Sequence, residues 1–152
     1  VLKMVIIHDL AESITGDIPP YEISKRNVKK NKNKAEKAAL KKILKGLPKS
    51  KIKEIMDLWE EMELKETLEA KFSQSLDKLE VVMQHNIADI NTWDQHDYTA
   101  SPYHRDEYFD FNPFMRALRD IVSVQGMKKI IKAKTEHLLD PKHLEKYKNN
   151  KK

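Results

Sequence analysis

The sequence contains no cysteine. Disulfide bonds and thiolate-bound zinc are therefore excluded, and any metal ion would have to be held by nitrogen and oxygen atoms. A chain that does without disulfides suits the reducing interior of a cell. We therefore expect a cytoplasmic protein.

Glycine, proline and long apolar segments are also scarce. Only 3 glycines and 6 prolines occur among 152 residues, and the remaining composition favours helices over strands. No apolar run approaches the roughly 20 residues that a membrane span requires. No signal-peptide pattern opens the chain. We predict an all-α protein that does not enter a membrane.

Apolar residues recur at helical spacing along most of the chain, divided by glycine, proline and capping residues. The length fits one domain. We predict a single-domain bundle of about six helices over residues 1–140, with a basic, mobile tail at 141–152. The predicted helices are a buried one over 2–14 ended by Gly16, one over 34–46, one capped by Ser50, the longest capped by Thr67, one from Asn112 to Gly126, and a last one to about 139. Residues 92–111, rich in aromatic side chains, are predicted as a long loop.

The same periodicity predicts which face of each helix is buried. The predicted inward residues are Leu2, Val5, Ile6, Leu10 and Ile14 in the first helix; Ala35, Ala39, Ile43 and Leu47 in the second; Ile52, Ile55, Met56, Trp59 and Met62 in the third; and Phe72, Leu76, Leu79, Met83, Ile87 and Ile90 in the longest.

Basic residues outnumber acidic ones, 29 against 24, and 13 of the 29 lie between Lys25 and Lys53. In that segment Glu36 is the only acid. One interpretation is a solvated lysine-rich face; the other is a docking surface for phosphates or acidic partners. The clustering favours the solvated face, so a nucleic-acid partner is not expected.

A histidine and an aspartate, His8 and Asp9, interrupt the apolar pattern of the first predicted helix. A carboxylate inside a buried helix costs several kcal/mol unless it is paired or bound to metal, so packing alone does not explain it. Glu12 follows one turn later, which places it on a neighbouring part of the same face. Imidazole and carboxylate suit Mn, Fe, Co, Ni or Zn, and a bound cation brings the pKa of its water to about 7.

A metal site of this kind needs ligands from a second helix, and Asp77, on the border of the apolar stripe in the longest predicted helix, is the best candidate. Each residue also has an ordinary structural interpretation. His8 could be a core histidine bonded to Asp9 or to a backbone carbonyl, and Asp77 a solvated carboxylate paired with a lysine.

Two blocks of sequence carry a family resemblance. Residues 8–12 read HDLAE and residues 15–19 read TGDIP, while residues 69–80 contain EAKF followed by LDKLE. This arrangement resembles the HD-domain superfamily, specifically its 5′-deoxynucleotidase branch, over about residues 1–120. The resemblance implies an HD-type helical bundle and one divalent metal ion, Mn, Co, or else Mg, Fe, Ni or Zn.

In that family the metal ligands are a first histidine on an upstream helix, the HD pair and a distal aspartate. By resemblance, the last three correspond to His8, Asp9 and Asp77. All other histidines of this chain follow the HD pair, so the first ligand has no counterpart, and we expect an N-terminal truncation. The resemblance further implies that Glu12 orients or activates the attacking water, that Asp17 handles protons near the phosphate, and that Pro19 shapes the substrate loop. It leaves open which carboxylate is the base and which the acid.

We therefore expect an enzyme, a metal-dependent phosphohydrolase that acts on deoxynucleoside or nucleoside 5′-monophosphates and, like its relatives, pairs as a homodimer. Two alternatives remain. One is hydrolysis of another phosphate ester, namely a nucleoside triphosphate, a cyclic nucleotide or an alarmone. The other is a non-catalytic helical module that binds nucleic acid through its lysines, with an affinity that falls steeply with salt.

Overall fold

The computed structural model describes residues 1–17, 26–100, 102–103 and 105–149, in two compact units, Val1–Ser73 and Gln74–Lys152. These residues form helices and turns and no strand, which confirms the predicted all-α class. No helix in this part of the chain is both long and apolar enough to cross a membrane.

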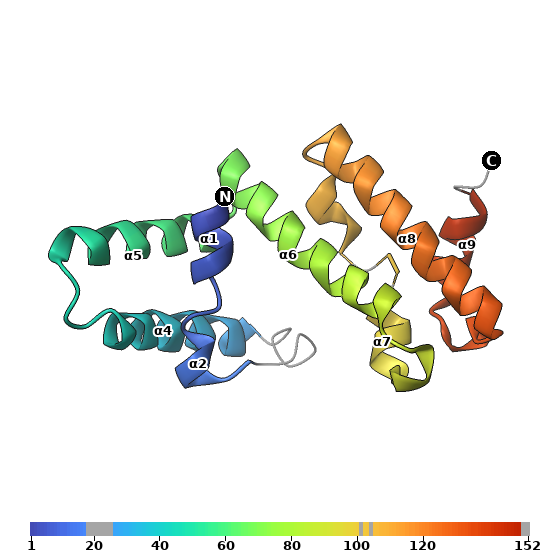
Figure 1. Cartoon of the computed structure of the whole chain (residues 1–152), viewed down its shortest axis with the longest axis horizontal. Helices are drawn as coiled ribbons and strands as arrows, with labels where there is room; N and C mark the ends of the chain where they lie inside the picture. Colours follow the sequence, from blue (N-terminus) through green and yellow to red (C-terminus); the bar gives the residue numbers. More distant parts are fainter. Residues whose placement is uncertain (18–25, 101, 104, 150–152) are drawn as a thin grey trace. The chain divides into compact units, whose positions relative to one another are not determined.

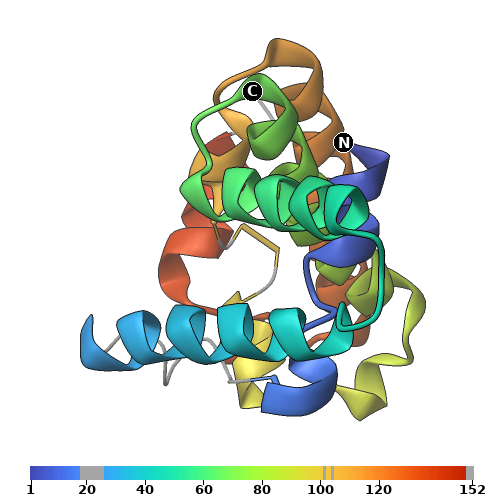
Figure 2. The same ribbon diagram turned by 90° about the vertical axis from the view of Figure 1, so that its left-hand side faces the viewer.

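The first unit, unit 1, contains α1 (Leu2–Ile7), α2 (Glu12–Thr15), α4 (Arg26–Ile43), α5 (Lys49–Leu64) and the first turns of α6 (Leu68–Ile87). Helix α1 packs against α5 and α2 against α4 (Figures 1 and 2). One apolar cluster joins these helices and is made of Ile7, Ala11, Ala39, Leu40, Leu44, Met56 and Trp59. The two short helices on either side of His8 and Asp9 are thus fixed on two longer ones.

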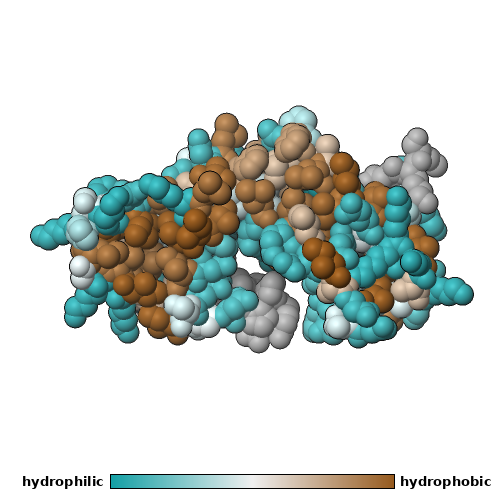
Figure 3. Space-filling model, in the orientation of Figure 1, coloured by the Kyte–Doolittle hydropathy of each residue, from teal (hydrophilic) through white to brown (hydrophobic). Residues whose placement is uncertain are grey.

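The predicted helix over 2–14 is in fact two helices with a turn between them. In the turn, Leu10 N donates to Ile7 O at 3.2 Å and Glu12 N to Asp9 O at 2.9 Å. These i→i+3 bonds mark the end of α1. The buried residues are Met4, Ile7 and Ala11, which are spaced three and four positions apart, as on one helical face. The predicted inward face was wrong, since Leu2 is 78% and Ile6 72% exposed. Brown apolar surface on unit 1 is visible in Figure 3.

The helix predicted over 34–46 begins earlier, at Arg26. Of its predicted inward residues Ala39 is buried, but Ala35, Ile43 and Leu47 are exposed. Glu36 and Leu40 of α4, and Leu44 just after it, are buried instead. Its predicted stop is confirmed, because Gly46 adopts φ +97°, a conformation that ends a helix. Helix α5 buries Met56, Trp59 and Met62 as predicted. It begins at Lys49, where Pro48 rather than Ser50 occupies the N-cap position.

Thr67 caps α6 as predicted, accepting a hydrogen bond from Ala70 N at 3.1 Å. The predicted apolar stripe is only partly buried. Leu79 is buried, but Met83 is 46% and Ile87 77% exposed. Outside the predicted stripe, α6 fully buries small and polar side chains, namely Ala70, Ser73 and Ser75.

The second unit, unit 2, holds the rest of α6 and then η1 (Ile90–Thr92), α7 (Gln95–Ala100), η2 (Asp106–Phe109), α8 (Pro113–Ala133), η3 (Glu136–Leu138) and α9 (Pro141–Asn149). Short helices occupy much of the segment predicted as a loop, and its aromatic residues Trp93, Tyr98 and Tyr103 belong to the core. The loop prediction was wrong because these aromatic residues bury enough area to fold a segment that lacks helical periodicity.

Helix α8 begins as predicted, since Asn112 Oδ1 accepts hydrogen bonds from Phe114 N at 2.9 Å and Met115 N at 3.2 Å. It does not stop at Gly126. This glycine lies against α6, and a Cβ there would be 2.7 Å from Asn86 Oδ1, so its role is close approach. The tail expected at 141–152 contains α9, whose His143 and Tyr147 are buried.

Candidate metal and phosphate site

His8 and Asp9 lie in the turn after α1 and contact one another. Nε2 of His8 is 3.0 Å from Oδ2 of Asp9, and Nδ1 is 2.7 Å from the carbonyl oxygen of Val5. The expectation that Asp9 is a buried helix carboxylate was wrong: its side chain is 59% exposed. The imidazole is more enclosed, at 19%.

The contact with Val5 O places one proton on the His8 ring. A carbonyl oxygen only accepts, so Nδ1 carries the proton that is donated to Val5 O, and a neutral ring directs the Nε2 lone pair at the Asp9 carboxylate. Two acceptors at this distance repel unless a proton or a cation lies between them. Ligand atoms about 2.1 Å from one metal ion and at a right angle to each other are about 3 Å apart. The pair therefore fits two ligands of a divalent metal.

A metal-binding histidine commonly donates the hydrogen of its other ring nitrogen to a backbone carbonyl, because this bond fixes the tautomer and the ring orientation. Within either unit, the described residues include no group of three histidine, aspartate or glutamate side chains placed to hold a metal ion. In unit 1, His8 and Asp9 are thus a pair, and the remaining ligands stay a prediction.

Glu12, expected beside the HD pair, forms an ion pair with α4. Its Oε1 accepts from Lys32 Nζ at 3.0 Å, and the same ammonium is 3.1 Å from Oε1 of Glu36. The segment from Glu12 to Thr15 is a short helix, and Thr15 is followed by Gly16 at φ +73°. Glycine favours this left-handed region, so the chain turns away there after a single helical turn.

The charges around Lys32 shift the pKa values of the group. Burial lowers the pKa of Lys32, but the hydrogen bonds to Glu12 and Glu36 raise it by more, so the net shift is upward. Burial raises the pKa of Glu36 above its ordinary value, against the opposing effect of Lys32. Lys32 is therefore a stable cation between two carboxyl groups.

The other predicted site residues are spread more widely. Asp17 is exposed and directly follows Gly16. Pro19 lies outside the described residues. Asp77 is in unit 2, on α6, where its side chain is about one-fifth exposed and pairs with Lys78. Its approach to His8 and Asp9 remains a prediction.

Lys32 and Glu36 were not predicted as part of the site. One signal was present, since Glu36 is the only acid in the lysine-rich segment and stands four residues after Lys32. That spacing brings the two side chains together on a helix. Lys32 was grouped with the solvated lysines of this segment, so its pairing with Glu36 was not recognised.

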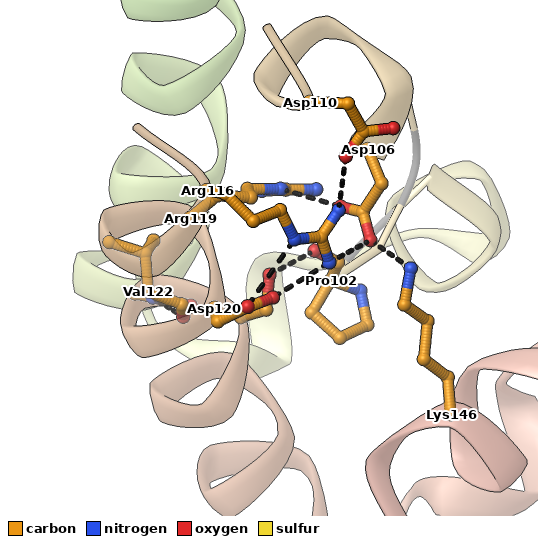
Figure 4. Close-up of polar contacts among 10 residues, drawn as sticks. Pro102, Asp106, Asp110, Arg116, Arg119, Asp120, Val122 and Lys146 are labelled. Carbon is orange, nitrogen blue, oxygen red and sulfur yellow. Dashed lines mark hydrogen bonds and ion pairs between the residues drawn. The ribbon is translucent and has the colours of Figure 1, made fainter. Parts of the chain in front are cut away.

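A second polar cluster, also missed, lies in unit 2. Asp106 in η2 accepts hydrogen bonds from Arg119 Nε at 2.9 Å and from Arg116 at 3.2 Å, both on α8, and it pairs with Lys146 of α9 (Figure 4). Arg119 is fully buried, with its guanidinium 5.2 Å from the centre of the Phe109 ring. This cluster connects η2, α8 and α9 within unit 2 and fixes how they pack.

Asp106 gives unit 2 a defined acid sensitivity. Burial raises the pKa of its carboxyl, but the hydrogen bonds from Lys146 and Arg119 lower it by more, so the pKa lies below the ordinary 3.8. A carboxyl group whose pKa is lower in the folded than in the unfolded protein stabilises the fold at pH values above the unfolded pKa, and this contribution disappears as pH falls through the folded pKa.

We expect the stability of unit 2 to fall below about pH 4. Urea unfolding between pH 6 and pH 2.5 measures it, and Asp106→Asn should flatten the dependence. A slope unchanged in that variant would contradict this assignment.

The model of the HD domain family matches residues 1–119. Among curated proteins, 5′-deoxynucleotidase HDDC2 of Xenopus laevis is 40% identical over 83 residues, and that of Homo sapiens 39% over 84 residues. The protein of the same name from Danio rerio is 43% identical over 84 residues. Each match covers 55% of this chain, and the chain spans about two fifths of each relative, 40%, 39% and 40%. No solved structure matches it significantly.

Proposed function

The chain belongs to the HD domain family, and we propose that it removes phosphate from nucleoside 5′-monophosphates, with deoxyribonucleotides as the preferred class. The observation that supports this most is the His8–Asp9 pair, which has the donor atoms and the separation of two metal ligands. The three relatives named above are each 5′-deoxynucleotidases, and their activity suggests the substrate class.

In this proposal His8, Asp9 and Asp77 hold one divalent metal ion, manganese or cobalt in the first place, together with a histidine upstream of the HD pair. When bound, the ion polarises the phosphoryl group as a Lewis acid and makes water a better nucleophile. His8 presents Nε2 because Val5 O retains the proton on Nδ1. Asp9 supplies negative charge that balances the cation.

Glu12 and Asp17 carry the proton transfers in this proposal. Glu12 orients or activates the attacking water, and Asp17 acts near the phosphate or its leaving oxygen, with Pro19 shaping the loop around the substrate. The acid and base roles of the two carboxylates stay open. Positioning contributes more than covalent chemistry in such a reaction, since the protein forms no bond to the phosphate.

A phosphate-release assay tests this function. We expect the chain, extended upstream to include the first histidine of the family, to release phosphate from dAMP or dTMP with Mn²⁺ or Co²⁺ and to lose this activity when a chelator removes the metal. A panel with nucleoside triphosphates, cyclic nucleotides and alarmones identifies the substrate class. No release with any divalent cation, or full activity in Asp77→Ala, would contradict the proposal.

We also propose that the protein is a cytoplasmic homodimer. Relatives in the family often pair, and the chain carries no cysteine that would need an oxidising compartment. Analytical ultracentrifugation gives the oligomeric state directly, and a monomer at all accessible concentrations would exclude the dimer.

A further inference from the structure

Lys32 lies between two carboxylates that come from different helices of unit 1. Its ammonium is 3.0 Å from Glu12 Oε1 on α2 and 3.1 Å from Glu36 Oε1, one turn further along α4. All three side chains are largely withdrawn from solvent: Lys32 is 18% exposed, Glu12 20% and Glu36 7%. The arrangement is a chain of charges, Glu36 to Lys32 to Glu12.

An ion pair that connects two helices does not require buried charges. On the same helix, Lys37 bonds Glu60 of α5 at 2.6 Å, with both side chains near half exposed. Such a surface pair costs little because its charges stay in water. Burying Glu36 beside Lys32 has a desolvation cost that a surface pair avoids, and truncating one member of a buried pair leaves an uncompensated charge.

The charged groups around Glu36 indicate how it acts on Lys32. Glu36 also faces Glu63 of α5, whose side chain accepts a hydrogen bond from Asn33 at 3.0 Å. The ammonium of Lys32 lies between two acidic groups and is kept protonated, and Glu36 holds it from the same helix, one turn away. The second partner of the ammonium, Glu12, lies on a different helix, α2.

We propose that Lys32 is a positioning residue that holds the carboxylate of Glu12 in its working orientation, and that Glu36 fixes Lys32 in turn. This rests on the proposed function, in which Glu12 acts on the attacking water. Lys32 occupies Oε1 of Glu12, and Oε2 then accepts the hydrogen bond from that water. Without the lysine, Glu12 on its single-turn helix would lose its orientation and the reaction would slow.

The test compares Lys32→Gln with Lys37→Gln in the extended chain, assayed with dAMP and Mn²⁺. For Lys32→Gln we expect kcat to fall by about 10- to 100-fold with KM within about twofold of wild type, because misplacement of about 1 Å can cost that much. Lys32→Arg should recover most of kcat, since it restores a cation in reach of both carboxylates. Glu36→Gln should lower kcat by a smaller factor. Lys37→Gln, which breaks a pair on the same helix, should leave kcat and KM unchanged.

The outcomes separate this inference from the function it rests on. A wild-type chain that releases no phosphate overturns both. An active wild type with normal kcat in Lys32→Gln overturns the inference alone, and so does a rise in KM without a loss of kcat, which would make Lys32 a substrate-binding group. Melting curves of both glutamine variants set the assay temperature, so that every variant is assayed well below its Tm. A kcat of Lys32→Gln that returns to the wild-type value at a temperature where the variant is fully folded would assign Lys32 to stability only.

Discussion

Asp106→Ala is expected to destabilise unit 2 by about 3–5 kcal/mol, the usual result of removing one partner from a buried ionic cluster. The Asp106 carboxylate forms ion pairs with Arg119, Arg116 and Lys146. Arg119 is fully buried, so its charge would remain in the interior without the carboxylate that compensates it. Since three elements meet at Asp106, the loss should spread through α8, η2 and α9.

Urea unfolding followed by tryptophan fluorescence measures this effect in the correct unit. Trp59 lies in unit 1 and Trp93 in unit 2, so a Trp59→Phe background reports on unit 2 alone. The matched control is Asp110→Ala, which removes an exposed carboxylate that also pairs with Arg116, at 3.2 Å. We expect that change to cost less than about 1 kcal/mol. Equal losses in the two variants would contradict the role given to Asp106.

Helix ends were well predicted where one side chain determines them. Thr67 and Asn112 accept backbone hydrogen bonds at the start of α6 and α8, and this preference is local to a few residues. The all-α class follows from composition in the same way. The family was predictable from the HD and distal aspartate blocks, and the match over residues 1–119 confirms it.

Buried faces were predicted less well, because they depend on partners distant in sequence. Helix α1 packs on α5 through the face that carries Ile7, so Ile7 and Ala11 enter the core while Leu2 and Ile6 stay exposed. Gly126 has the local signature of a helix end, yet α8 continues through it, and Asn86 of α6 lies so close that a Cβ there would clash. Neither the choice of face nor the close approach is visible in a single helical pattern.

The candidate site was predictable in its residue types and less so in its local structure. His8 and Asp9 were singled out as a charged pair in a buried helix, and they lie instead in a turn where Asp9 is exposed. The ion pair from Glu12 to Lys32 depends on the packing of α2 against α4, which periodicity does not contain. Sequence thus identified the chemistry, and the tertiary contacts determine how each carboxylate is held.

Asp9→Asn is expected to reduce phosphate release by about 100-fold or more, the largest effect on activity that we predict. Metal assistance is worth several kcal/mol in the transition state, and each 1.4 kcal/mol is about tenfold in rate. An amide is a neutral and weaker ligand than a carboxylate, so the affinity for Mn²⁺, measured by calorimetry, should fall as well. The fold should tolerate the change because the Asp9 side chain is solvent-facing.

Asp57→Asn is the matched control for this prediction. Its carboxylate is on α5 in the same unit, and its side chain is 59% exposed, the same fraction as for Asp9. It pairs with Lys53 at 2.5 Å and has no role in the proposed site. We expect metal affinity and turnover of this variant to equal those of wild type. If both aspartate variants lose activity equally, the effect is one of surface charge; if neither does, the His8–Asp9 pair does not hold the catalytic metal, and the arrangement of the imidazole against Val5 O is purely structural.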